Sequence, residues 1–318
     1  MTTALAVTSA RLEADDVISI VLADPAGRVL PDWRPGAHLE LALPSGLLRQ
    51  YSLCGSPENR TEYRIAVLRE ANGRGGSREL HDTGLVGKTL KVNGPRNHFE
   101  LVPSSRYLFI AGGIGITPIL AMVRSLGSSV PWSLHYGGRT RSSMAFTDEL
   151  CRIGGARVAL SPQDEDGLLD VDAIVGGADE STAIYCCGPA PLLEAVREAC
   201  ARLARGASLH IERFTASPAG SKVPAANGEN TTVAVELRRS GVTVQAGPER
   251  SILDAIREIV PEAPYSCTEG YCGSCEVRVI EGVPDHRDEI LTAEEREGGR
   301  TMFPCVSRAL SERLVLDI

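Results

Sequence analysis

The chain has 318 residues, of which 43% are hydrophobic and 23% charged, so it is long enough for two or three folded domains. Its formal net charge of −8 disfavours binding to a nucleic-acid backbone, and no apolar stretch reaches the length of a membrane span. The N-terminal segment lacks a basic region followed by an apolar run, so we expect no signal peptide and a cytoplasmic protein.

Residues 1–102 are predicted to form a small antiparallel β-barrel, because short alternating runs such as VISIVLAD and YRIAVLRE recur between Gly and Pro clusters. On one predicted strand, Arg49, Tyr51 and Ser52 place a cation, an aromatic ring and a hydroxyl along the chain. The segment 73–77, GRGGS, is rich in backbone donors and suits a phosphate. Taken alone, such a tyrosine is more often a packed barrel residue, and such a segment is more often a mobile loop.

Residues 103–214 are predicted to form an α/β domain with a parallel sheet. The apolar run 107–111 has strand length and leads into GGIGITP at 112–118 and then a helical pattern. A strand, a glycine turn and a helix N-terminus present backbone N–H groups to a pyrophosphate. Two further strands, WSLHYGG and TAIYCCG, also precede turns or helices, as in a βαβ nucleotide-binding sheet. The glycine pattern is not the full G-x-G-x-x-G fingerprint, so a tight turn without a ligand stays open.

Residues 215–230 are rich in small, Pro and Gly residues and are predicted to be a linker. Residues 231–318 are predicted to form a small α+β domain with a hairpin and a short helix that Ser251 opens. Residues 229–318 contain seventeen acidic residues, ten arginines and no lysine. Such an acidic surface can steer a basic partner or simply aid solubility.

Four of the nine cysteines follow the pattern C-x4-C-x2-C with a distant fourth cysteine, which is typical of plant-type 2Fe-2S ligation. Gly270 and Gly273 would let this loop turn tightly. Zinc is the weaker alternative because only one C-x2-C pair is present, and a disulfide framework fits a long chain poorly. The other cysteines are by default small buried side chains. The four candidate metal ligands are Cys267, Cys272, Cys275 and Cys305.

In their order along the chain, these motifs resemble the phthalate dioxygenase reductase family, and within it the vanillate O-demethylase reductases. The order is RQYSL, GRGGS, GGIGITP, YCCGP, ERF and then the cysteine motif. The resemblance covers nearly the whole chain. It implies a flavin-binding barrel first, a pyridine-nucleotide domain second and a β-grasp plant-type ferredoxin domain at 231–318 last. Relatives that serve benzoate-type oxygenases carry the ferredoxin at the other end.

The resemblance also implies how the flavin is held. Arg49 should approach its phosphate, Tyr51 should pack on the isoalloxazine, and Ser52 should hydrogen-bond near the reactive edge. Leu53, the next residue, is also expected to contact the flavin. A second phosphate-binding segment should include Gly75, Gly76 and Ser77. The flavin is expected to be FMN, because family members with this domain order use FMN, although no residue independently excludes FAD.

The resemblance implies that Cys187 is the family's active-site cysteine beside the nicotinamide. It also implies that Phe214 covers the flavin. These two residues and Ser52 are therefore the catalytic candidates. Arg139 and Arg141 could grip a 2′-phosphate, yet relatives with a similar stretch prefer NADH, so NADH is expected and NADPH is the alternative. The remaining residues matched to the nucleotide turns are Gly112, Gly113, Gly115, Thr117, Gly188 and Pro189.

The implied activity is transfer of a hydride from NADH to FMN, followed by single-electron steps to the 2Fe-2S cluster and on to an oxygenase. The expected acceptor is a Rieske-type aromatic dioxygenase or O-demethylase, with a haem-thiolate monooxygenase second. A redox sensor that keeps the cluster without oxidising NADH is a hypothesis of another class. A protein that docks transiently is expected to be a monomer.

Overall fold

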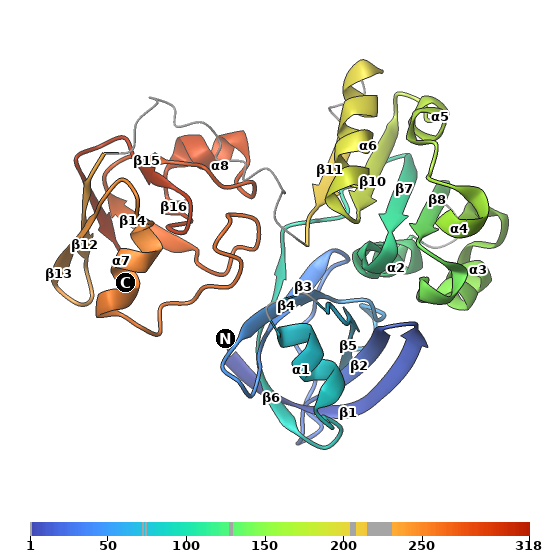
Figure 1. The fold of residues 1–318 in the computed structure, drawn as a ribbon, viewed down its shortest axis with the longest axis horizontal. Coiled ribbons are helices and arrows are strands. Elements are labelled where there is room, and N and C mark those ends of the chain that lie inside the picture. Colours follow the sequence, from blue (N-terminus) through green and yellow to red (C-terminus); the bar gives the residue numbers. More distant parts are fainter. Residues whose placement is uncertain (1, 72, 74, 127–129, 204–207, 215–230) are drawn as a thin grey trace. The chain divides into compact units, whose positions relative to one another are not determined.

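The computed structural model describes residues 2–71, 73, 75–126, 130–203, 208–214 and 231–318, and the predicted linker at 215–230 lies outside them. The chain divides into two units, Met1–Thr215 and Ala216–Ile318 (Figure 1). The first unit contains an antiparallel barrel and an α/β domain, and the second is an α+β domain. None of the helices in the described residues combines the length and apolar composition needed to traverse a bilayer.

The barrel is a six-stranded antiparallel sheet in the order β4-β3-β6-β1-β2-β5. It closes through a bridge between Leu53, which follows β4, and Ile65 in β5. Closure pairs the two edge strands, and the interior is filled with apolar side chains, including Leu80 of α1. The elements are β1 (Thr2–Ala14), β2 (Val17–Ala23), β3 (Ala37–Ala42), β4 (Leu48–Ser52), β5 (Glu62–Leu68), α1 (Gly76–Asp82) and β6 (Thr89–Asn97).

The α/β domain is a five-stranded parallel sheet in the order β11-β10-β7-β8-β9. The chain runs outward from β7 to β9 and then returns to the other side of β7, so β7 and β10 flank the point where the strand order reverses. Ligands of such sheets bind there, outside the carboxyl ends of the strands. The strands are β7 (Arg106–Gly112), β8 (Trp132–Gly138), β9 (Val158–Pro162), β10 (Thr182–Cys187) and β11 (Leu209–Glu212).

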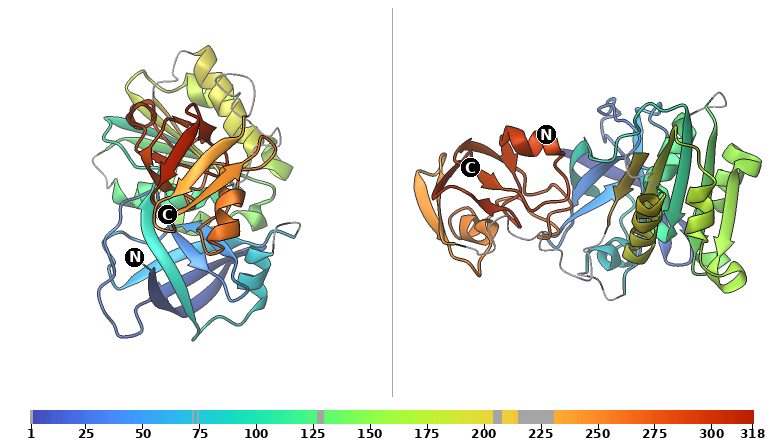
Figure 2. Two further views of the ribbon diagram at one scale, coloured as in Figure 1. Left: turned by 90° about the vertical axis from the view of Figure 1, so that its left-hand side faces the viewer. Right: turned by 90° about the horizontal axis from the view of Figure 1, so that it is seen from above.

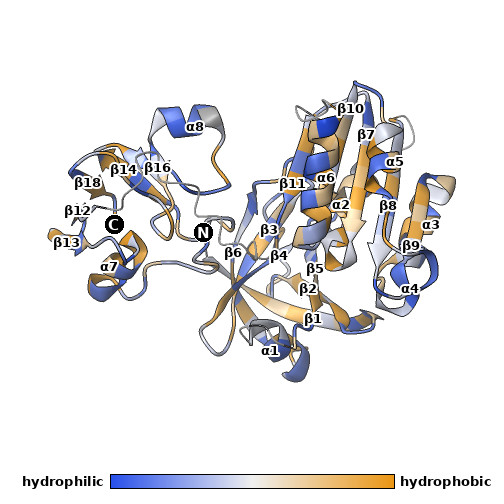
Figure 3. Ribbon diagram, turned by 45° about the horizontal axis from the view of Figure 1, so that its top comes forward, coloured by the Kyte–Doolittle hydropathy of each residue, from blue (hydrophilic) through white to orange (hydrophobic). Residues whose placement is uncertain are grey.

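Helices cover both faces of this sheet, as the two views in Figure 2 show. Phe109 of β7 packs with α2, whereas the next residue, Ile110, packs with α5 and α6. Figure 3 shows the strands mainly in hydrophobic colours and hydrophilic positions on α6. The helices are α2 (Ile116–Ser125), α3 (Thr147–Gly154), α4 (Gln163–Asp166), α5 (Val171–Gly176) and α6 (Ala190–Arg202), with 3₁₀ turns at Gly113–Gly115, Arg141–Ser143 and Gly155–Arg157.

One hydrophobic core joins the barrel to the α/β domain. Val17, Cys54 and Ala66 of the barrel segment belong to the same buried cluster as Phe109 and Ile116. Burial of apolar surface is the dominant favourable contribution to such packing. The two domains therefore form one unit.

The C-terminal unit is built on a mixed five-stranded sheet, β13-β12-β18-β14-β16. As predicted, Ser251 caps α7 by accepting a hydrogen bond from Asp254 N–H at 3.0 Å. The buried Arg308 donates to four backbone carbonyls, those of Thr231, Ala246, Gly247 and Arg250. The elements are β12 (Val233–Leu237), β13 (Val242–Ala246), α7 (Ile252–Ile259), β14 (Val277–Glu281), β15 (Pro284–Asp285), α8 (Ala293–Gly298), β16 (Thr301–Met302), β17 (Arg308–Ala309) and β18 (Arg313–Leu316). The predicted multidomain fold class is confirmed.

Candidate functional site

The two predicted phosphate-binding segments lie against each other. A methyl group added to Gly76 would come within 2.6 Å of Arg49 Nε, so the arginine side chain lies directly on the start of α1. Gly75 has a φ of +91°, which favours glycine. The Ser77 hydroxyl accepts a hydrogen bond from Glu70 N–H at 3.0 Å and thereby stabilises the loop. A cation beside a loop of backbone donors fits the phosphate of a flavin nucleotide.

The strand β4, which is predicted to bind the flavin, directs its side chains in different directions. Tyr51 is half-buried against the barrel core, and burial raises the pKa of its phenol, which therefore stays neutral. Leu53 is fully buried in that core, so its side chain serves the barrel. The buried Ser52 contacts the α/β domain at the carboxyl of Glu212, the last residue of β11.

Glu212 is a candidate site residue that the sequence analysis missed. Its Oε2 atom is buried and has no hydrogen-bond partner among the described residues. Burial raises the pKa of this carboxyl to about 8, while the Ser52 side chain opposes the shift. A glutamate ending the last strand was visible in the ERF segment, but only the fold shows that the carboxyl is buried beside the flavin strand.

The two nucleotide turns meet at the reversal point between β7 and β10. Cys187 pairs with Ala111 across these strands. A methyl group on Gly115 would come within 2.3 Å of Cys187 O, and one on Gly112 within 2.6 Å of Pro189 Cδ. Glycine is therefore required for this approach. Gly188, next to Cys187, is also constrained, because a methyl group added to it would lie 2.9 Å from the backbone nitrogen of Gly112.

Cys187 lies near the carboxyl described above. Its thiol is fully buried, and burial, with a further contribution from Glu212, raises its pKa well above the usual value. Three strand ends thus converge here, those of β4, β10 and β11, which carry Ser52, Cys187 and Glu212. Phe214 follows two residues after Glu212 and packs, partly buried, on the shared core.

The remaining residues predicted to contact the nucleotide have different environments. Gly113 has a φ of +52°, and a methyl group added to it would meet no atom within 4 Å. The Thr117 hydroxyl donates a hydrogen bond to Ile114 O at 3.0 Å and thereby stabilises the turn. Arg139 and Arg141 are exposed after β8. The guanidinium of Arg141 pairs with Glu165 of α4 at 2.8 Å.

The four predicted ligand cysteines are buried and form two pairs. The thiol of Cys267 lies beside that of Cys272, and the thiol of Cys305 lies beside that of Cys275. The contact within the first pair raises the pKa of Cys267 and lowers that of Cys272. Two thiols per pair is the donor set that each iron of a 2Fe-2S cluster requires. Across the described ranges, no group of three or more Cys, His, Asp or Glu side chains is arranged to hold a metal ion.

The cysteine loop also supplies backbone donors to sulfur. Glu269 N–H donates to Cys267 Sγ at 3.3 Å, and Cys267 N–H donates to Cys272 Sγ at 3.4 Å. Gly270, with a φ of +79°, leaves no room for a side chain because a methyl group would lie 2.7 Å from Val306 Cγ2. Hydrogen bonds of this kind tune the reduction potential of a cluster. The residues present therefore fit a 2Fe-2S group.

Comparison with known proteins agrees with this geometry. A family model described as a 2Fe-2S iron-sulfur cluster binding domain matches residues 235–310. Phenoxybenzoate dioxygenase subunit beta of Ectopseudomonas oleovorans is 45% identical over 308 residues, which cover 96% of this chain and 94% of that protein. A solved phthalate dioxygenase reductase, described as a modular structure for electron transfer from pyridine nucleotides to 2Fe-2S, is 36% identical, with a TM-score of 0.70 and coverage of 100% of this chain and 98% of that chain.

A solved intact type IV self-sufficient cytochrome P450 monooxygenase is also similar, at 41% identity and a TM-score of 0.87. The match covers 100% of this chain but 41% of that protein. The chain therefore spans less than half the length of that relative.

Replacing Gly115 with alanine should lower kcat/KM for NADH by about 100-fold while flavin content is retained, because the new methyl group would displace the Cys187 turn. Steady-state ferricyanide reduction measures this. Gly177→Ala is the matched control, since its nearest neighbour would be at 3.4 Å. Equal losses in both variants would contradict the assignment of the turn.

Replacing Glu212 with glutamine should stabilise the protein increasingly as pH rises from 5 to 8. The folded-state pKa of about 8 exceeds the ordinary 4.5, so over this range the unfolded chain ionises first and the wild type loses stability. The expected advantage of the variant is about 3 kcal/mol at pH 7 and disappears below pH 4.5. Thermal unfolding against pH measures it, with the exposed Glu180→Gln as control. A pH-independent difference would contradict the buried neutral carboxyl.

Proposed function

The chain belongs to the phthalate dioxygenase reductase family, and on this basis we propose that it carries electrons from NADH through FMN to a 2Fe-2S cluster and on to the oxygenase of an aromatic-degrading system. It is an oxidoreductase, a pyridine-nucleotide-dependent flavin iron–sulfur reductase. The observation that carries the proposal is the convergence of Ser52 at the end of β4 with Cys187 and Glu212, which pair across β10 and β11.

A nicotinamide gives up two electrons together as a hydride, a 2Fe-2S cluster accepts one at a time, and a bound flavin supplies both kinds of transfer. The protein residues would provide positioning and a suitable electrostatic environment. With the pKa of Glu212 raised to about 8 and that of the Cys187 thiol raised further, both groups are neutral near pH 7. A hydride donor therefore approaches a buried region without fixed negative charge.

We assign the flavin phosphate to Arg49 and the segment 75–77, which the fold brings together. The flavin is proposed to be FMN, as in family members with this domain order. Tyr51 and Phe214 supply the aromatic surfaces for the isoalloxazine. The four cysteines hold the cluster in two pairs, as described above.

The donor is proposed to be NADH. Arg141 is already paired with Glu165, and α4 carries two further acids, Asp164 and Asp166. The backbone of α4 is tied to the arginine segment, because Asp164 N–H donates to Arg139 O at 3.2 Å. These carboxylates would repel a 2′-phosphate and compete for the arginine that would bind it.

The acceptor is proposed to be a Rieske-type oxygenase, because the similar phenoxybenzoate and phthalate proteins are named as parts of dioxygenase systems. A haem-thiolate monooxygenase is the second candidate, which the 41% identity to a self-sufficient cytochrome P450 favours. Reconstitution with each type of oxygenase would separate the two, because only the true acceptor should turn over its substrate at the rate of NADH oxidation.

Replacing Cys305 with serine should leave NADH-dependent ferricyanide reduction within about twofold but lower cytochrome c reduction by about tenfold or more, because electrons would leave from the flavin only. Loss of the cluster's visible absorbance confirms the change. Cys151→Ser, at an exposed cysteine outside both pairs, is the control. If both activities survive once the cluster is lost, the proposed electron path is wrong.

Replacing Glu165 with glutamine should raise kcat/KM for NADPH by about 3- to 10-fold and leave that for NADH nearly unchanged, because Arg141 would lose its partner. Glu194→Gln, which breaks an exposed ion pair on α6, is the matched control. A wild type that prefers NADPH, or an Arg139→Gln variant that selectively loses NADPH use, would contradict the proposed donor.

A further inference from the structure

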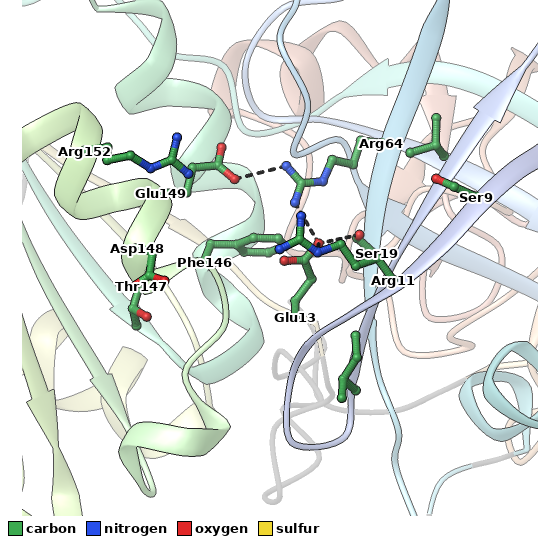
Figure 4. Close-up of a pocket in the computed structure, with 12 residues that line it drawn as sticks. Ser9, Arg11, Glu13, Ser19, Arg64, Phe146, Thr147, Asp148, Glu149 and Arg152 are labelled. Atoms are coloured by element: carbon green, nitrogen blue, oxygen red, sulfur yellow. Dashed lines mark hydrogen bonds and ion pairs between the residues drawn. The ribbon is translucent and has the colours of Figure 1, made fainter.

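Arg64 lies between two carboxylates that belong to different domains of the first unit. Its Nη2 is 2.9 Å from Glu13 Oε1 in β1, and its Nη1 is 3.1 Å from Glu149 Oε2 in α3. The three side chains are only 8–19% exposed. They line a cavity of about 360 Å³ between the barrel strands and α3 (Figure 4).

The network continues into the nucleotide domain. The Arg64 guanidinium stacks 4.7 Å from the centroid of the Phe146 ring, directly before α3. Glu149 also forms an ion pair with Arg124 of α2. The opposite end of α2 begins at the glycine turn that contacts Cys187. Arg64 is therefore connected through two helices to the turn assigned to the nicotinamide.

On its other side, Arg64 is attached to the flavin strand through the backbone. Its carbonyl accepts a hydrogen bond from Cys54 N–H at 2.8 Å, two residues after Ser52. The bridge between Leu53 and Ile65 adjoins this bond. A methyl group on Gly55 would lie 3.3 Å from Arg64 Cβ, so the segment also packs closely on the arginine. Any movement of the arginine would be transmitted to the end of β4.

We propose that Arg64 is a positioning residue for hydride transfer, holding the flavin strand and the nicotinamide turn at a fixed separation through Glu149. The inference rests on the proposed function. Arginine suits this task because its planar fork can bind both carboxylates at once, which a lysine point charge cannot. Hydride transfer is steeply sensitive to such placement, since a 1 Å misplacement can cost about 100-fold in rate.

A role limited to stability would look different in experiments. Breaking a buried ion pair leaves an uncompensated charge and lowers stability, so flavin content and every route of reduction would fall together. A positioning role predicts that only the step requiring nicotinamide and flavin together becomes slow. Photochemical reduction of the flavin and cluster does not use the nicotinamide, and it therefore distinguishes the two roles.

The experiment uses the full-length protein with both bound cofactors in the variants Arg64→Gln, Glu149→Gln and the double variant. Anaerobic mixing with NADH should show flavin reduction about 10- to 100-fold slower in each single variant, with KM for NADH within about threefold. Photochemical reduction and flavin content should remain at wild-type levels. The double variant should be no slower than the worse single variant within about twofold, because both changes cut the same connection.

Arg28→Gln is the control, since it breaks an ion pair at 2.7 Å between the exposed Arg28 and Asp24, which both belong to the barrel domain. Wild-type rates of NADH reduction in both single variants would overturn the inference, as would equal losses in NADH and photochemical reduction. Additive losses in the double variant would also overturn it. A wild type that is reduced by light but not by NADH or NADPH would instead contradict the proposed function.

Discussion

The hydrophobic core shared by the barrel and the α/β domain is the constraint on which the candidate site depends. Residues as distant in sequence as Val17 and Phe109 are buried in one cluster, so the two domains cannot separate without exposing it. Polar groups at the same junction, among them Ser52 and Glu212, are thereby held in a region where water is largely excluded. The raised pKa of the Glu212 carboxyl follows from this burial.

Glycine has a different role at this junction. Side chains pack the two domains together, whereas the absence of side chains at Gly112 and Gly115 lets two turns of the nucleotide sheet touch. The packing of side chains between the domains tolerates exchange among apolar residues, whereas the close approach of the two turns does not tolerate an added side chain. A protein that must align a flavin with a nicotinamide needs both the packed domains and the touching turns.

Much of the fold followed from local pattern, because strand alternation, glycine turns and cysteine spacing are properties of neighbouring residues. The order of these motifs was sufficient to identify the family and the three-domain fold class. Glu212 was missed because its importance comes from burial against Ser52, a residue 160 positions earlier. Arg64 was missed for the same reason, since an arginine in a barrel strand gives no sign of carboxylates supplied by β1 and α3. Contacts between residues that are distant in the sequence could not be predicted from local sequence patterns.

The pairing of the four cysteines has a consequence for the lifetime of the protein. Cys275 and Cys305 come from segments that lie before and after α8 in the sequence. Iron bound between the two cysteines would cross-link these segments. The apoprotein would lack this cross-link and offer proteases a more readily opened C-terminal unit. Iron supply in the cell would then set how much of the reductase persists as well as how much of it is active.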